Sequence, residues 1–285
     1  MQNDRKETEN ETLTVIARRR SVRAFTDEPV SKAHRQAVLG AMRRAPTAGN
    51  MMLYSVIEVT SPEKKAYLAD SCDNQPWIAT APLVLVFLAD QQRWADLYEH
   101  AGAQAAAERA GVATREPGMG DLFIAASDAL IAAQNAVLAA ESLGLSSCYV
   151  GDILENYEEH RKLLDLPPLA MPITMLCVGH AKKRARAGEP TPRLPEEAVV
   201  FQDRYRRLSG KELDAAFEGH RRYSFGEGKF MPGAANLGQH YYLRKVTAPF
   251  SLEMDRSVRA ALTAWDHPRS ADSQRSDGRR DGGSK

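Results

Sequence analysis

A basic cluster near the N-terminus offers the clearest chemistry in the sequence. Arg19, Arg20, Ser21 and Arg23 place three guanidinium groups and one hydroxyl within five positions. A guanidinium group is planar and donates hydrogen bonds in a fork, which suits the oxygens of a phosphate. The cluster therefore predicts a phosphate site. A solvated basic surface is the competing interpretation, and it is the more frequent one for such a run standing alone.

The common catalytic and nucleotide-binding signatures are absent from the sequence. It contains no GxGxxG after an expected strand, no GxxxxGK[ST], no HExxH and no GxSxG. Rossmann, P-loop, zinc-protease and serine-hydrolase functions thereby lose their main support. A reaction that a bound cofactor carries out needs no acid, base or nucleophile from the protein. The sequence is compatible with such a reaction, which would need no catalytic side chain, but this does not by itself identify the cofactor.

The three cysteines, Cys72, Cys148 and Cys177, are odd in number and far apart. They show no CxxC or CxxH spacing, which argues against a disulfide framework and against a zinc site. We expect reduced, buried thiols in a cytoplasmic protein, and no metal.

Charge and hydropathy exclude several kinds of partner. Lys and Arg number 38 against 37 Asp and Glu, so a net charge of +1 provides no field that would attract nucleic acid or anionic lipid. The first eleven residues are polar, and no apolar run reaches the ~20 residues that a membrane span requires. We expect neither a nucleic-acid nor a membrane partner.

Alternating helices and strands must position the basic cluster. Apolar runs predict buried strands at 83–88 and 173–178, and β-branched residues predict further strands at 53–60 and 145–150. Helices are expected from residue 13, from Ser31 to 45, from 61, at 121–143, 155–164 and 211–222, and in part of 239–265. The 121–143 helix is apolar nearly all round, which is typical of a central helix. This alternation indicates a layered α/β or α+β fold.

Four short motifs carry a resemblance to a known family. The segments RRSVRAF at 19–25, APTAGN at 45–50, AAESLGL at 139–145 and TPRLP at 191–195 occur in the order and spacing of the FMN-dependent nitroreductase superfamily. The chain resembles that family from about Leu13 to Pro195. Its extension to about Trp265 makes it most similar to the larger, group A oxygen-insensitive NADPH nitroreductases and their flavin reductase relatives.

The resemblance implies an architecture. The family fold is α+β, with a mixed central sheet flanked by helices in an intertwined homodimer whose two flavins lie at the subunit interface. Residues 1–195 would form the FMN-binding core. Residues 196–265 would form a C-terminal extension that completes the dimer and covers the active site. The tail at 266–285 has almost no apolar residue and is expected to be disordered.

The resemblance also assigns cofactor-binding residues. Arg19, Arg20, Ser21 and Arg23 match the segment that holds the FMN phosphate, the ribityl chain and part of the ring edge. Arg193, close to Thr191, matches the second phosphate-binding arginine, and Gln75 matches a side chain that hydrogen-bonds the pyrimidine end of the flavin. Two further segments complete the set: Thr47, Ala48 and Asn50, in a loop usually contributed by the other subunit, and Val150, Gly151 and Asp152, in the turn against the ring.

Three positions depart from the group A pattern. Arg19 stands where those enzymes typically have His, Thr191 where they have Lys, and Asp152 where they often have Gly. The lost lysine removes a charge from the phosphate site, which Lys182 or Lys183 would replace. Asp152 adds a carboxylate that, if ionised, opposes the anionic reduced ring and lowers its potential.

The C-terminal extension is expected to bind the nicotinamide donor. Basic residues there grip the 2′-phosphate of NADPH in group A enzymes, and the candidates here are Arg221, Arg222 and Lys229. An ordinary basic surface loop explains the same residues equally well. NADPH is favoured over NADH as the electron donor.

The implied activity is a ping-pong reductase. NAD(P)H reduces FMN and leaves, and small-molecule oxidants (nitroaromatics, quinones or free flavin) then take the electrons in the same pocket. The alternative is a non-catalytic flavin-binding protein that acts as a store or sensor. A third interpretation takes 275–280 as a nucleic-acid contact, but its interleaved Asp residues favour a solvated tail.

Overall fold

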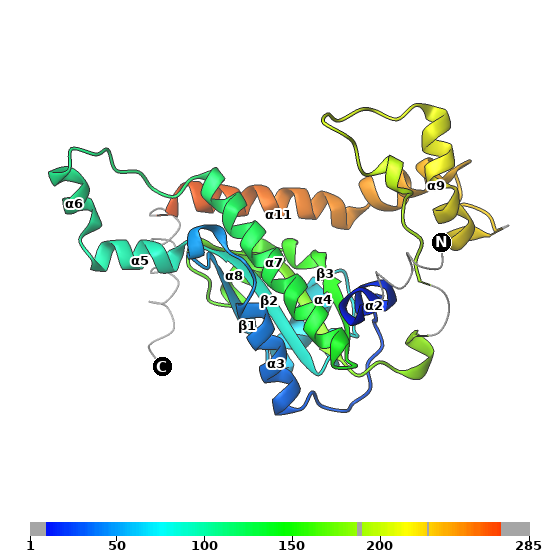
Figure 1. The fold of residues 1–285 in the computed structure, drawn as a ribbon, viewed down its shortest axis with the longest axis horizontal. Helices are drawn as coiled ribbons and strands as arrows, with labels where there is room; N and C mark the ends of the chain where they lie inside the picture. The colour runs from blue at the N-terminus through cyan, green and yellow to red at the C-terminus, as the bar shows by residue number, and fades with distance from the viewer. Residues whose placement is uncertain (1–9, 187–189, 227, 269–285) are drawn as a thin grey trace, which may run out of the picture. The chain divides into compact units, whose positions relative to one another are not determined.

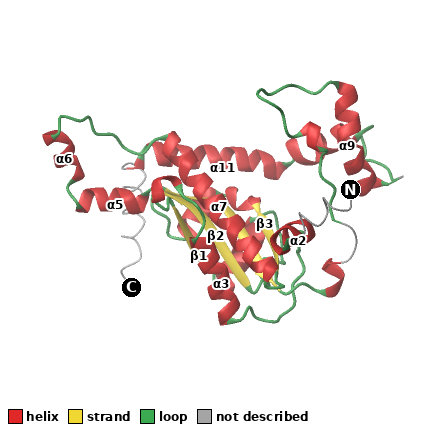
Figure 2. Ribbon diagram, in the orientation of Figure 1, coloured by secondary structure: helices red, strands yellow, loops and turns green. Residues whose placement is uncertain are grey.

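The computed structural model describes residues 10–186, 190–226 and 228–268. These fall into two compact units, which are described separately: residues 10–186 with 253–268, and residues 190–252. Figures 1 and 2 show the elements of each. The expected disordered tail lies mostly outside the described residues.

The first unit is built on a four-stranded sheet in the order β1-β2-β4-β3. The strands are β1 (Tyr54–Glu58), β2 (Leu83–Asp90), β3 (Ser146–Val150) and β4 (Ala170–Gly179), and each neighbouring pair is antiparallel. A parallel bridge joins Ser21 to Ser147. Within the described residues, the mixed character of the sheet rests on that bridge. The α+β fold class is confirmed.

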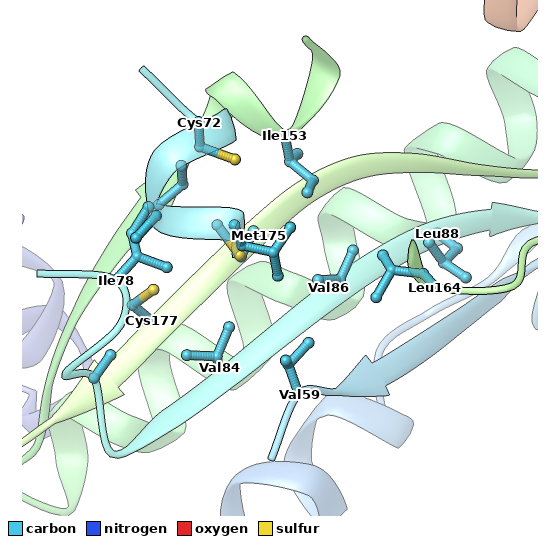
Figure 3. Close-up of a cluster of buried hydrophobic side chains, with 14 of the residues drawn as sticks. Val59, Cys72, Ile78, Val84, Val86, Leu88, Ile153, Leu164, Met175 and Cys177 are labelled. Carbon is cyan, nitrogen blue, oxygen red and sulfur yellow. The ribbon is translucent and has the colours of Figure 1, made fainter. Parts of the chain in front are cut away.

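The inner strand β2 is buried on both faces, as its continuous apolar run predicts. Leu83, Leu85 and Phe87 belong to one core cluster, which α3 (Lys32–Arg43) and α7 (Met119–Ser142) complete. Side chains of the opposite parity join a second cluster with α4 (Pro62–Ser71) and the segment after β3. Figure 3 shows Val84, Val86 and Leu88 in this second cluster. The period-2 alternation of the strand thus divides one apolar run between two cores.

Helix α7 is the central helix of this unit (Figure 1). By length and composition alone it could span a membrane, with a mean hydropathy of 1.6 over its most apolar stretch. However, nine of its side chains are buried inside the unit, and its alanines pack against the sheet and α3. This packing is that of a core helix, as the sequence predicts. The helix ends before Gly144, whose φ of 77° lies in the left-handed region that favours glycine.

The remaining helices of this unit include two that the sequence analysis did not assign, α5 (Gln92–His100) and α6 (Ala103–Arg109). Neither has a fully buried residue, although Trp94 of α5 packs against a core cluster and donates to the carbonyl of Met51 at 2.8 Å. In Figure 1 they extend away from the sheet. The others are α2 (Glu11–Arg18), η1 (Ala48–Asn50), η2 (Gly151–Leu154), α8 (Tyr157–Leu163), η3 (Lys183–Arg186) and α11 (Pro249–Asp266).

Helix α11 caps helix α8. The first backbone amides of α8 have no partner within the helix, because the carbonyls that they would bond lie before its start. The Ser257 hydroxyl accepts from the N–H of Tyr157 at 2.8 Å, and the Glu253 carboxylate accepts from that of Asn156 at 3.2 Å. Arg256 bonds both Glu253 and Glu158. The start of α8 is therefore completed by residues about a hundred positions later in the chain.

The second unit is helical. Its elements are η4 (Glu196–Ala198), α9 (Gly210–Phe225), α10 (Leu237–Tyr241) and the π-helix η5 (Tyr242–Val246). Ser209 and Glu212 form a capping box at the start of α9, which fixes the N-terminus of this helix. The helix expected at 211–222 is confirmed.

Candidate functional site

The basic segment, residues 19–23, runs beside the edge strand β3. Arg19 caps α2, and the chain then pairs with the strand through the N–H of Val22, which donates to the carbonyl of Ser147 at 3.0 Å. Burial raises the pKa of the neighbouring Cys148 thiol, and Arg23 and Arg19 oppose that rise. The two guanidinium groups therefore lie close to Cys148. The pairing with β3 gives the segment a fixed backbone from which its side chains project.

The chain leaves β3 through the β3 turn, residues 150–152. Gly151 is exposed, and a Cβ added there would meet nothing within 4 Å. The turn therefore presents bare backbone with open space beside it, as a close approach of a planar ligand requires.

Gln75 reaches the β3 turn from the segment after α4. Its amide nitrogen donates to the carboxylate of Asp152 at 2.7 Å and to the carbonyl of Cys72 at 2.9 Å. Both partners are acceptors, so they fix the orientation of the amide. Its side-chain oxygen has no partner among the described residues and can accept a hydrogen bond from a ligand. The structure thus brings together Gln75, the β3 turn and the basic segment, all at one edge of the sheet.

The loop at 47–50 is held by a different device. Asp128, in the middle of α7, is only 3% exposed, and its carboxylate accepts from the N–H groups of Ala48 at 3.0 Å and Leu53 at 3.1 Å. Gly49 and Asn50 adopt positive φ angles of 55° and 57°. The two hydrogen bonds from backbone N–H groups to Asp128 hold this left-handed backbone in one conformation.

The loop and the basic segment lie at opposite edges of the sheet. The loop precedes β1, and the basic segment accompanies β3, which is the other edge strand. Three strand spacings separate these edges, or about 14 Å across the sheet. A single chain therefore keeps these two parts of the expected FMN site apart.

The other expected residues belong to the second unit. The exposed Arg193 donates to the carbonyls of Thr191 at 3.2 Å and Pro192 at 3.4 Å. Arg221 and Arg222 both pair with Glu218, at 2.7 Å and 2.9 Å, and these arginines lower the pKa of Glu218 to about 2. A phosphate on either guanidinium would compete with a carboxylate that stays ionised. Lys229 is exposed.

Comparison with known proteins places the chain. The model of the nitroreductase family matches residues 16–180, which is more than half of the chain. The chain belongs to the nitroreductase family. It is 35% identical to an FMN reductase [NAD(P)H] of Bacillus subtilis over 213 residues, covering 74% of this chain and 80% of the relative. It is also 33% identical to an oxygen-insensitive NADPH nitroreductase of Salmonella typhimurium, over 71% of this chain and 78% of the relative.

A solved member of the family shares the fold. The structure of B. megaterium NfrA2 matches with a TM-score of 0.72 at 30% identity, covering 90% of this chain and 98% of that one. The family named from the four motifs is therefore confirmed. The roles of the individual site residues stay predictions, which the geometry above supports to different degrees.

Two residues around the nitroreductase site were missed by the sequence analysis. Asp128 had a signal, because a carboxylate in the middle of an alanine-rich, buried helix needs a partner. Glu155, which follows η2 and is 5% exposed, had none, since its neighbours come from distant parts of the chain.

Proposed function

We propose that this chain is an FMN-dependent oxidoreductase that transfers electrons from NAD(P)H to small oxidised molecules. The observation that carries the proposal is the gathering of the basic segment, Gln75 and the β3 turn along one edge of the sheet, in a chain of the nitroreductase family. Relatives named FMN reductase and NADPH nitroreductase support the choice of cofactor and donor. The acceptors are nitroaromatics, quinones or free flavin.

The residues present fit FMN. The guanidinium groups of the basic segment supply forked donors for the phosphate. The side-chain oxygen of Gln75 would accept from the N–H of the flavin pyrimidine, while Asp152 and the carbonyl of Cys72 hold the Gln75 amide nitrogen. Gly151 allows the backbone to approach the ring closely. When bound, the flavin supplies the two-electron transfer chemistry itself, so the protein's part is to bind, orient and exclude water.

The proposal includes a homodimer. The site is divided between opposite edges of one sheet, so the 47–50 loop of one subunit would meet the basic segment of the other. Helix α7 also leaves several large apolar side chains in solvent: Phe123 at 70% exposure, Ile124 at 46%, Leu130 at 47% and Ile131 at 41%. Apolar side chains gathered in this way on one helix mark a contact surface. A second copy would cover them and complete both flavin sites.

The proposed sequence of steps assumes that one pocket binds the donor first and the acceptor afterwards. NADPH is the favoured donor, because Arg221 and Arg222 can turn from Glu218 to its 2′-phosphate, which NADH lacks. After the oxidised nicotinamide leaves, the acceptor takes its place in a ping-pong cycle. The protein works in the cytoplasm, where both nicotinamides are available.

An absorbance spectrum tests the proposal. Purified protein, incubated with FMN and desalted, should be yellow, and anaerobic NADPH should bleach the flavin bands faster than NADH does. Adding a quinone after the nicotinamide has been removed should restore the flavin bands. A colourless protein would refute the cofactor. A yellow protein that neither nicotinamide bleaches would be a flavin store rather than a reductase.

A further inference from the structure

Two carboxyl groups meet directly after β3. Asp152 lies in the single turn of η2, and Glu155 follows it at the third position, with its N–H bonded to the Asp152 carbonyl at 3.0 Å. In a 3₁₀ turn, side chains three apart are eclipsed. The Glu155 carboxyl group is accordingly within hydrogen-bonding reach of the Asp152 side chain.

Glu155 is buried and incompletely bonded. Only 5% of it is exposed, and its Oε1 atom has no hydrogen-bond partner within the part of the chain that the structure describes. A buried carboxylate without a cation or a full set of donors is strongly disfavoured, whereas the neutral acid is tolerated. Burial, with Asp152 and Asp73 nearby, raises the pKa of Glu155 to about 7.

The groups that face Glu155 from each neighbouring element add no positive charge. Asp73 and the Cys72 thiol follow α4, and burial raises the pKa of that thiol well above its usual range. From α8, His160 donates its Nδ1–H to the carbonyl of Ile153, and burial lowers its pKa, which favours the neutral ring. From α11, Glu253 faces Glu155, while Arg256 is occupied by Glu253 and Glu158.

The pair is connected to the proposed flavin site. Asp152 accepts from the Gln75 amide at 2.7 Å, which directs the Gln75 oxygen toward a ligand. Asp152 is also one of the three residues of the β3 turn. A second negative charge on the pair would therefore arise next to the cofactor, in a region of low dielectric where charges interact strongly.

We propose that Asp152 and Glu155 hold one proton between them, and that this proton makes FMN binding by the protein depend on pH. The inference rests on the proposed function, because it assigns a role toward FMN. With the proton in place the pair carries one negative charge, Asp152 accepts from Gln75, and Glu155 stays neutral. Loss of the proton leaves two carboxylates beside an anionic cofactor, and the affinity falls.

The dissociation constant of FMN, measured by fluorescence quenching on the apoprotein, tests this inference between about pH 6 and about pH 8.5, on either side of the Glu155 titration. The native protein should bind FMN at least about fivefold more weakly at the upper limit, as for a modest coupling between two sites. Glu155→Gln, which imitates the neutral acid, should remove that loss. The FMN phosphate titrates equally in both proteins, so their difference isolates the pair.

A matched control and a second readout keep the test decisive. Glu159→Gln makes the same exchange at an exposed position on α8 and should retain the native pH profile. The pH dependence of the apoprotein's stability is a second readout that does not involve FMN. Because folding raises the Glu155 pKa from 4.5 to about 7, the contribution of Glu155 to stability is largest below about pH 4.5 and declines as the pH rises toward 7. The Glu155→Gln variant should not show this decline in stability. In Asp152→Asn the decline should occur at lower pH, because Asp152 no longer raises the pKa of Glu155.

The outcomes separate the two proposals. If native protein and Glu155→Gln both bind FMN and show equal pH profiles in binding and in stability, the proton pair is overturned and the oxidoreductase is left intact. An apoprotein that does not bind FMN at any pH would overturn the proposed function. If the apoprotein alone shows the predicted loss of stability with pH, the shared proton stands without a role toward FMN, and the coupling is refuted.

Discussion

Replacing Asp128 by Asn should loosen the 47–50 loop and weaken FMN binding together. The native carboxylate accepts hydrogen bonds from two backbone N–H groups, at 3.0 Å and 3.1 Å, and Asp128 is only 3% exposed. Asn can accept only one of them, and its NH₂ group then faces the other N–H. A hydrogen bond to a charged group contributes about 1.5–3 kcal/mol, so Asp128→Asn should lower the free energy of unfolding by about that amount. Asp128→Ala loses both bonds and should cost roughly twice as much.

Urea unfolding of the apoprotein and FMN titration of the folded variant measure these two effects. We expect the dissociation constant of FMN to rise roughly tenfold, equivalent to about 1.4 kcal/mol, because the loop must be ordered on binding. Asp121→Asn is the matched control on the same helix. Asp121 accepts one backbone hydrogen bond, from the N–H of Gly118 at 2.8 Å, and also accepts from the exposed guanidinium group of Arg115. Its loss should cost about 1 kcal/mol of stability and leave FMN affinity unchanged.

The reasoning about the loop would be refuted if the free energy of unfolding of Asp128→Asn lay within about 0.5 kcal/mol of that of the native protein. A variant with the expected loss of stability but native FMN affinity would refute only the link between the loop and the cofactor. The magnitudes are large enough to measure, since domains are stable by about 5–15 kcal/mol.

Two further variants test the phosphate site and the dimer. Arg23→Ala removes an exposed guanidinium and should weaken FMN binding about tenfold without affecting riboflavin, which lacks the phosphate. Arg109→Ala, exposed on α6, should change neither affinity, and an equal loss for riboflavin would remove Arg23 from the phosphate site. Ile131→Glu, which charges the exposed face of α7, should give monomers in sedimentation experiments and weaken FMN binding at the same time. Val112→Glu, at a 61% exposed position outside that helix, should sediment as the native protein does, and a monomer that binds FMN normally would contradict the shared site.

The sequence predicts those parts of the fold in which burial follows a local period. Strands β2 and β4 are continuous apolar runs because the sheet is covered on both faces, and α7 is apolar nearly all round because it lies in the core. Helix α5 was missed although Trp94, Leu97 and Tyr98 have a helical spacing, and α6 was missed because it consists of alanine and polar residues and has no apolar stripe.

The site is predicted less completely, because it depends on contacts between distant positions. The family resemblance assigned Gln75 and Asp152 separately, but their hydrogen bond joins residues 77 positions apart and has no local signature. The proton on Glu155 depends on Asp73, from the segment after α4, and Glu253, from α11, which only the folded chain brings together. Charge relationships of this kind follow from tertiary packing rather than from periodicity.

The capping of α8 by α11 sets an order on the synthesis of this protein. The helix that follows the β3 turn begins at Tyr157, but the hydroxyl that caps it belongs to Ser257. A ribosome adds the intervening residues over roughly 5–20 s, at ~5–20 residues per second. Throughout that interval the nascent chain already contains the basic segment, Gln75 and the β3 turn, yet the helix that follows the turn lacks its cap. The support that α11 gives to the start of α8 therefore arises only after α11 has emerged, and a chain stopped before α11 leaves the first amides of α8 without these caps.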